Sequence, residues 1–180
     1  MYKKREPLII ILSGKAKSGK NLVANYIKEY YKENNCIEVA YAYYIKDYLK
    51  RMNKYNEQEK NKYRSLLQEF GVEFLSKQID SKFLINRVME DIEVFSYFYD
   101  VIVITDARLV EEIEIPKQKF SNVITIRIEN NNNNNLTELE KNHITETGLD
   151  NYTGFDYILK NNSTIEDLKK QIIEILKGVK

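Results

Sequence analysis

Five short apolar segments along the chain have the length and composition of β-strands. The first, Leu8 to Leu12, is a continuous apolar run without alternation, which predicts a strand buried on both faces, as in a parallel sheet. The other four segments follow it along the chain, at 37–40, 101–104, 123–128 and 157–159.

Helical periodicity fills most of the stretches between these segments. Apolar residues recur at helical spacing in five of them, 20–31, 41–52, 57–78, 81–96 and 110–120. Ser163 and Glu166 are spaced as a capping box that opens a last helix. One face of this last helix is expected to carry Ile165, Leu168, Ile172 and Ile175. Because strands and helices alternate, we predict α/β architecture with a parallel sheet.

Residues 14–21, which read GKAKSGKN, lie between the first predicted strand and the first predicted helix. They match the phosphate-binding pattern GxxxxGK[ST] at Gly14, Gly19 and Lys20. The glycines let backbone N–H groups turn inward around phosphate oxygens, and the next helix presents its positive N-terminus there. We therefore predict a P-loop for a nucleoside triphosphate, formed by Gly14, Lys15, Ala16, Ser18, Gly19, Lys20 and Asn21.

Three residues of this loop have distinct expected roles. Lys20 is expected to reach the β- and γ-phosphates and to follow their charge in the transition state. Asn21 replaces the usual Ser or Thr and offers Mg²⁺ an amide oxygen, directly or through a water. Lys17 is either a contact to the transferring phosphoryl group or a solvated loop lysine.

A second candidate phosphate site follows the third predicted strand. Asp106 stands just beyond this strand, and Arg108 lies two residues later. Ligands of open parallel sheets bind beyond the carboxyl ends of the strands. There Asp106 could hold Mg²⁺ or act as a base, and Arg108 could clamp a phosphate. The alternative is a turn aspartate paired with a neighbouring cation.

The overall composition excludes some classes of protein. The 180 residues suit a single domain spanning 1–180. The chain has 28 basic and 27 acidic residues, which argues against a dedicated nucleic-acid binder. Cys36, the only cysteine, is expected to be a buried structural thiol. No signal peptide or membrane-spanning run is recognisable, so we expect a cytoplasmic protein.

Short motifs in a fixed order resemble a group of P-loop small-molecule kinases. These are GKAKSGKN at 14–21, Lys46 after the second strand, YRSLLQEFG at 63–71, TDAR at 105–108 and HITETGLDN at 143–151. The group includes phage and bacterial deoxynucleoside monophosphate kinases and animal-type phosphomevalonate kinases.

The resemblance implies a nucleoside-monophosphate-kinase-like fold with a five-stranded parallel sheet flanked by helices. It also implies ATP as the donor, Mg²⁺ as the cofactor and an acceptor that already carries a phosphate. A substrate-binding helical region would cover about 41–97, and a lid about 129–147. Lys46, Arg64, Gln68 and Arg108 would face the acceptor.

The predicted lid departs from the pattern of such kinases, which bring arginines from the lid onto the phosphates. Six consecutive asparagines begin at Asn130, and residues 129–142 contain no arginine, with Lys141 as their only cation. His143 could contact a phosphate or base, or could form only a local hydrogen bond. Glu146 could orient His143 or pair with an arginine of the site.

The leading hypothesis is ATP-dependent phosphorylation of a nucleoside or deoxynucleoside monophosphate to the diphosphate, by a monomer or homodimer. The first alternative is a kinase for a non-nucleotide phosphate such as phosphomevalonate. The second is a nucleotide-binding module without transferase activity, which Asn21 and the arginine-free lid favour and Asp106 and Arg108 disfavour. No nucleic-acid or membrane partner is expected.

Overall fold

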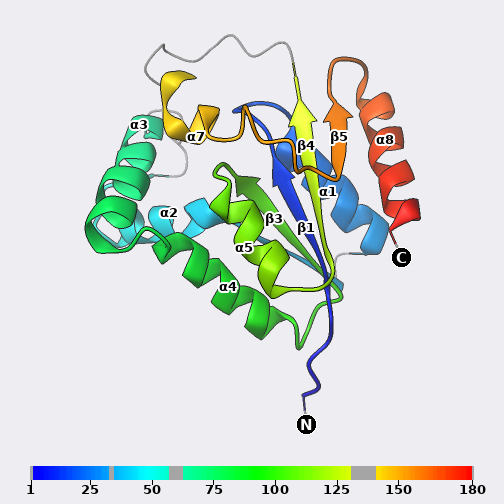
Figure 1. The fold of residues 1–180 in the computed structure, drawn as a ribbon, viewed down its shortest axis with the longest axis horizontal. Helices are drawn as coiled ribbons and strands as arrows, with labels where there is room; N and C mark the ends of the chain where they lie inside the picture. Colours follow the sequence, from blue (N-terminus) through cyan, green and yellow to red (C-terminus); the bar gives the residue numbers. More distant parts are fainter. Residues whose placement is uncertain (1, 33–34, 57–62, 131–140, 180) are drawn as a thin grey trace.

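The computed structural model describes residues 2–32, 35–56, 63–130 and 141–179. Its centre is a parallel sheet with strand order β2-β3-β1-β4-β5 (Figure 1). The strands are β1 (Leu8–Ser13), β2 (Cys36–Val39), β3 (Val101–Ala107), β4 (Val123–Glu129) and β5 (Tyr157–Lys160). This five-stranded parallel sheet with flanking helices confirms the predicted fold class.

Helices cover both faces of the sheet, as Figure 1 shows. They are α1 (Lys20–Tyr31), α2 (Tyr41–Arg51), α3 (Arg64–Gln68), the π-helix η3 (Glu69–Ile79), α4 (Phe83–Phe95), α5 (Glu111–Lys119), α7 (Ile144–Thr147) and α8 (Ile165–Gly178). Helices α1 and α8 pack on one face, and α2, α4 and α5 pack on the other. Within the described residues, no helix is both long and apolar enough to span a bilayer.

Strand β1 explains why the sheet needs helices on both faces. Ile9 and Ile11 belong to the apolar core beneath α2, α4 and α5. Leu8, Ile10 and Leu12 belong to the core beneath α1 and α8. All five side chains are buried, so the continuous apolar run is a doubly covered central strand, as predicted.

The register of the parallel strands brings the chemically interesting segments to one edge. Strand β1 pairs with β3 and β4, so its end at Ser13 lies beside Ala107 and Arg127. The loop after β1 and the residues at the end of β3 therefore meet at the carboxyl edge of the sheet, where ligands of such folds bind.

The predicted helix at 57–78 is wrong in its details. Its first six residues, 57–62, lie outside the described residues, and the remainder divides into α3 and η3. The π-helix has wider turns than an α-helix. Within it, the Ser76 side-chain hydroxyl donates to the backbone carbonyl of Gly71, five residues earlier. Gly71 lies so close to Ile45 that an added Cβ would be 2.6 Å from the Ile45 Cδ1. Apolar spacing alone does not distinguish this widened helix from an α-helix.

The predicted capping box at the last helix is displaced by one residue. The N-cap is Thr164, whose side chain accepts the backbone N–H of Asp167, and Asp167 reciprocates. Ser163 instead donates its hydroxyl to the Asp167 carboxylate. With this start, Leu168 and Ile172 are buried as predicted, whereas Ile165 is exposed.

Cys36 is buried at the start of β2, in agreement with the expected structural thiol. Its burial raises the pKa of the thiol to about 11, so the reactive thiolate is disfavoured at neutral pH.

Candidate functional site

The loop after β1 wraps around the amine of Lys20. The Lys20 Nζ donates to the carbonyl oxygens of Gly14 at 2.6 Å and Lys15 at 2.9 Å. Lys17 adopts a positive φ of 60°, and Gly19, the N-cap of α1, has a φ of 104°. These left-handed residues let the chain turn back over the start of α1, as a phosphate-binding loop requires.

Lys20 is a buried cation surrounded by other charges. Burial, followed by the nearby Arg108, lowers the pKa of Lys20 to about 7, while Glu146 and Asp106 act in the opposite direction. Burial likewise lowers the pKa of Arg108. Several kcal/mol of desolvation are typical for such buried cations, so an anion between them would be strongly favoured.

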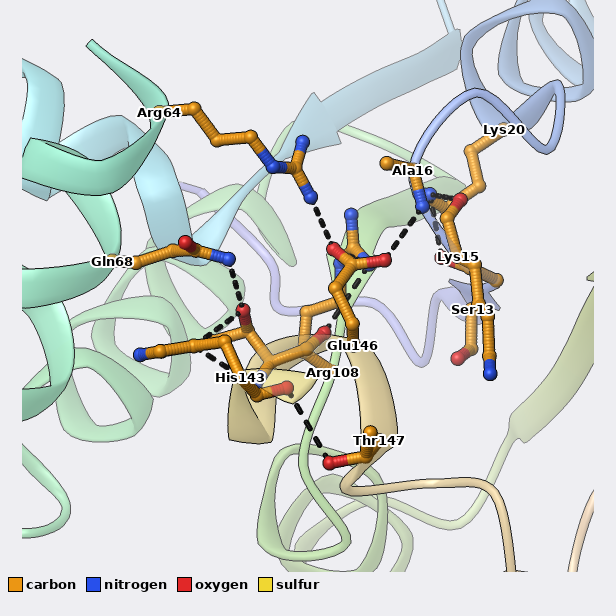
Figure 2. A network of polar contacts seen from close by, with 12 residues as sticks. Ser13, Lys15, Ala16, Lys20, Arg64, Gln68, Arg108, His143, Glu146 and Thr147 are labelled. Atoms are coloured by element: carbon orange, nitrogen blue, oxygen red, sulfur yellow. Dashed lines mark hydrogen bonds and ion pairs between the residues drawn. The ribbon is translucent and has the colours of Figure 1, made fainter. Parts of the chain in front are cut away.

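Glu146 supplies an anion at the centre of this group. Its Oε2 accepts the backbone N–H of Ala16 at 2.9 Å. Its Oε1 accepts from the Arg108 guanidinium at 2.8 Å and from the Arg64 guanidinium. Figure 2 shows the carboxylate between Arg64 and the loop. Glu146, on α7, therefore binds groups from three other segments, which are the loop, α3 and the end of β3.

A short chain of hydrogen bonds joins α3 to α7 beside Glu146. The Gln68 amide donates to the Thr145 hydroxyl at 3.0 Å, and this hydroxyl lies 3.0 Å from the His143 Nδ1. His143 is the N-cap of α7, and its ring accepts the Thr145 backbone N–H. The His143 imidazole thus forms a local hydrogen bond, which the sequence offered as an alternative to a phosphate or base contact. Burial lowers the pKa of His143.

Asp106 caps the N-terminus of α2 with its side chain. Its two carboxylate oxygens accept the backbone N–H groups of Tyr41 at 2.8 Å and Ala42 at 2.9 Å. A helix N-terminus favours an acidic partner because its first N–H groups lack acceptors within the helix. Asp106 therefore fixes the start of the helix that carries Lys46.

Glu112 is a site residue that the sequence reasoning missed. Its carboxylate accepts the backbone N–H of Arg108 at 2.6 Å and of Leu109 at 3.1 Å. Burial raises the pKa of Glu112 to about 8, against the opposing effect of the Arg108 N–H. The available signal was its position in the first turn of the helix after TDAR, four residues beyond Arg108.

A cavity of about 710 Å³ opens between the loop, α2, α3 and the end of β3. Most predicted site residues line it: Ala16, Lys17, Ser18, Gly19, Lys20, Asn21, Lys46, Arg64, Gln68, Asp106, Arg108 and Glu146. Gly14, Lys15 and His143 are not among its described lining residues. Gly14 and Lys15 instead bind Lys20 through their carbonyls.

Arg127, in β4, points toward the loop. Its guanidinium lies 3.4 Å from the Ser13 hydroxyl and 3.4 Å from the Asp150 carboxylate, and it stacks on Phe155. Asp150 also accepts from the Lys15 amine at 2.9 Å. Arg127 and Asp150 thus tie the segment after α7 to the loop, and sequence spacing gave no signal for this contact.

Asn21 and Asp106 are the two predicted metal-ligating residues, and both line the cavity. Within the described ranges, no group of three or more His, Cys, Asp or Glu side chains could hold a metal ion. This donor set fits Mg²⁺ bound with a nucleotide, because that ion takes one or two protein oxygens and otherwise uses waters and phosphates.

The sequence profile of one protein family, described as deoxynucleotide monophosphate kinase, matches residues 52–172. This range is more than half of the chain and contains Arg64, Arg108 and Glu146, whereas the loop at 14–21 precedes it. No curated protein sequence matches the chain significantly.

Several solved structures share the fold. The Thermus thermophilus protein TT1252 has a TM-score of 0.56 at 13% identity, over 98% of this chain and 100% of that chain. Shikimate kinase from Aquifex aeolicus has a TM-score of 0.53 at 15% identity, over 95% and 97%. APS kinase from Mycobacterium tuberculosis has a TM-score of 0.51 at 11% identity, over 96% and 99%. At these identities the likeness concerns the fold alone.

Proposed function

The chain belongs to the deoxynucleotide monophosphate kinase family, and from this premise we propose that it transfers the γ-phosphoryl group of ATP to a deoxynucleoside monophosphate. The products are ADP and the deoxynucleoside diphosphate. The observation that carries the proposal is the convergence of a P-loop N–H, Arg64 and Arg108 on one anion within the cavity.

The donor half of the site is the P-loop. Its inward-facing backbone and the N-terminus of α1 suit the β- and γ-phosphates. The Lys20 amine, held within the loop at the Gly14 carbonyl, would bind a phosphate oxygen there. Gly19 leaves no room for a side chain at the start of α1, because an added Cβ there would be 2.5 Å from the Asn161 Nδ2.

The acceptor half lies between α2, α3 and η3. Its wall combines an apolar surface from Ile45, Leu67, Val72 and Leu84 with polar groups from Lys46, Arg64 and Gln68. An apolar wall with a few placed polar groups suits a nucleobase and sugar, and the guanidinium groups suit the phosphate.

Phosphoryl transfer needs positioning and charge stabilisation more than covalent help from the protein. Lys20 would neutralise charge on the donor side, and Arg64 and Arg108 would bind the transferring group and the acceptor phosphate. Mg²⁺, when bound with ATP, would supply further charge neutralisation at the β- and γ-oxygens. Asn21 and Asp106 are the residues that would hold it or its waters.

A coupled assay of ADP formation tests this function. We expect turnover with at least one of dAMP, dGMP, dCMP and dTMP, dependent on both acceptor and Mg²⁺. Lys20→Ala should reduce kcat/KM by about 100-fold or more, because it removes a charge that stabilises the transition state. The exposed Lys177→Ala on α8 is the matched control and should keep full activity.

Two acceptor sets separate the proposal from its nearest alternative. Ribonucleoside monophosphates and phosphomevalonate are assayed under the same conditions. Turnover with phosphomevalonate and none with any nucleotide would assign the chain to the non-nucleotide alternative. No ADP formation with any acceptor, from a protein with a cooperative unfolding transition, would contradict the kinase proposal itself.

A further inference from the structure

Glu146 lies where a phosphate ligand would find its partners. Its side chain is 2% exposed, and those of Arg64 and Arg108 are 26% and 21% exposed. A P-loop N–H and two guanidinium groups are donors that proteins commonly use for phosphate oxygens. Here both oxygens of one carboxylate accept them.

The Ala16 N–H has a single hydrogen, so it can serve either the Glu146 carboxylate or a phosphate, whereas each guanidinium has further N–H groups. The Ala16 N–H points at the Glu146 Oε2, and both guanidinium groups point at the Oε1 (Figure 2). A phosphate that receives hydrogen bonds from the same donors must take the place of the carboxylate. Both anions cannot share the position, because two like charges in contact repel each other strongly.

The segment that carries Glu146 is a short and partly exposed helix. Helix α7 has only four residues, Ile144–Thr147, and both Ile144 and Thr147 are exposed. Hydrogen bonds of Glu146 and Thr145 join it to the P-loop, to Arg108 and to α3. Leu149, two residues after α7, is buried in the core and anchors the chain beyond it.

We propose that Glu146 is an internal occupant of a substrate-phosphate subsite formed by the Ala16 N–H, Arg64 and Arg108, and that a substrate phosphate displaces it. This inference rests on the proposed function and deepens it by identifying the groups that hold the phosphate. The common chemistry is a phosphate dianion, which comes either from the γ-position of the donor or from the acceptor.

The test compares Glu146→Gln with wild type by calorimetric titration. Gln has the same shape and one acceptor oxygen but no charge, so it competes poorly with a phosphate. Glu174→Gln is the matched control, because Glu174 is exposed on α8 and its removal changes the net charge equally. The probes are ADP, a non-hydrolysable ATP analogue, dTMP, dGMP and inorganic phosphate.

We expect Glu146→Gln to bind at least one phosphate-bearing probe about tenfold more tightly than wild type does, with ADP affinity unchanged. A gain for the ATP analogue but not for ADP identifies the donor γ-phosphate. A gain for a monophosphate identifies the acceptor phosphate, whereas a gain for inorganic phosphate supports displacement from either source. Equal or weaker binding of every probe would overturn the proposal and make Glu146 a positioning residue for Arg64 and Arg108.

The variant removes the charge that Arg64 and Arg108 share at Glu146, so its folding needs an independent measurement. Inorganic phosphate should raise the thermal unfolding midpoint of Glu146→Gln more than that of wild type, because it restores the missing anion.

A third measurement uses the wild-type protein. The amides of Glu146 and Gly148 donate within α7 to His143 and Ile144. Their hydrogen exchange should accelerate when a saturating phosphate ligand releases the segment, and slower exchange would contradict displacement. None of these measurements requires turnover, so the inference and the proposed kinase activity can fail separately.

Discussion

Asp106, near the carboxyl end of β3, accepts a hydrogen bond of 2.8 Å from the backbone N–H of Tyr41, the first residue of α2. Its other oxygen accepts from the backbone N–H of Ala42, so each carboxylate oxygen caps the helix through one lone pair and keeps another for a cation. Because α2 carries Ile45 and Lys46 into the cavity wall, Asp106 couples the shape of the acceptor half to the end of β3. We infer that Asp106 makes two separable contributions, one to the stability of α2 and one to the binding of Mg²⁺.

Substitution of Asp106 should separate these contributions. Asp106→Ala removes both acceptors and should lower the free energy of unfolding by about 1–2 kcal/mol, in addition to reducing activity. Asp106→Asn keeps one acceptor oxygen, so it should lose less stability but need more Mg²⁺ for half-maximal rate. Urea unfolding and Mg²⁺ titrations of the rate measure the two effects. An Asp106→Ala protein as stable as wild type would exclude the capping role.

Lys20 should take up a proton when ATP binds at pH 8. Its pKa is lowered to about 7 in this structure, so most Lys20 amines are neutral at pH 8. Phosphates beside the amine favour the ammonium form and raise its pKa again. We expect an uptake approaching about one proton per ATP, measured by calorimetry in buffers of different ionisation enthalpy.

The control for this proton uptake is Lys20→Arg, since arginine stays protonated at this pH. The variant should show little uptake on binding the same nucleotide. Equal uptake by the variant and wild type would place the titrating group elsewhere.

Glu112 should make the protein less stable as pH rises toward 9. Its pKa is raised to about 8 in the folded chain, whereas an unfolded Glu titrates near its usual value of 4.5. Between these values the folded state keeps a proton that the unfolded state has released. The contribution of Glu112 is therefore fully present below pH 4.5 and is lost as pH rises through 8.

Glu112→Gln tests this linkage, because an amide oxygen can still accept from the Arg108 and Leu109 N–H groups but does not titrate. From pH 5 to pH 9, wild type should lose on the order of 1 kcal/mol or more of unfolding free energy relative to the variant. The exposed neighbour variant Glu111→Gln should follow wild type. Parallel pH profiles for wild type and Glu112→Gln would refute the linkage.

Local sequence patterns predicted the strands and the P-loop of this fold well, because these features depend mainly on residues that are close in the sequence. The apolar run at β1 and the glycines at 14 and 19 define the central strand and the loop without reference to distant segments. The patterns failed where two alternative helix starts have similar local sequences. Ser163 with Glu166 and Thr164 with Asp167 are overlapping capping signals, and only the packed helix selects the second.

The structure brings most of the predicted site residues to one cavity, but the sequence did not specify which of them are in contact. Glu146 was expected either to orient His143 or to pair with an arginine, and tertiary structure decides for the pairing, since Arg108 lies 38 residues before it. The same holds for Asp106, whose contact with α2 spans 65 residues. Glu112 went unnoticed because an acidic residue in the first turn of a helix is common for reasons of helix stability alone.

Asn21 should influence how the protein uses Mg²⁺. It is exposed in the first turn of α1 and lines the cavity, at the position where related loops carry a hydroxyl. Asn21→Ser supplies that hydroxyl and should lower the half-saturating Mg²⁺ concentration several-fold, whereas Asn21→Ala should raise it. Identical Mg²⁺ dependence in all three proteins would exclude Asn21 from the metal site.

Gly19 should tolerate no side chain, for two separate reasons. Its φ of 104° is unfavourable for any L-residue, and a Cβ there would lie 2.5 Å from the Asn161 Nδ2. Gly19→Ala should therefore lose about 1–3 kcal/mol of unfolding free energy and weaken binding of an ATP analogue. Gly178→Ala is the matched control, since a Cβ at Gly178 meets nothing within 4 Å.

The double variant Gly19→Ala/Asn161→Ala separates the steric conflict from the backbone strain. Asn161 donates to the Ser18 carbonyl at 2.9 Å, so its truncation alone should cost some stability. In combination with Gly19→Ala it removes the clash but leaves the unfavourable φ. The two losses should therefore sum to more than the loss of the double variant, measured by urea unfolding. Strict additivity would mean that backbone strain alone requires glycine at this position.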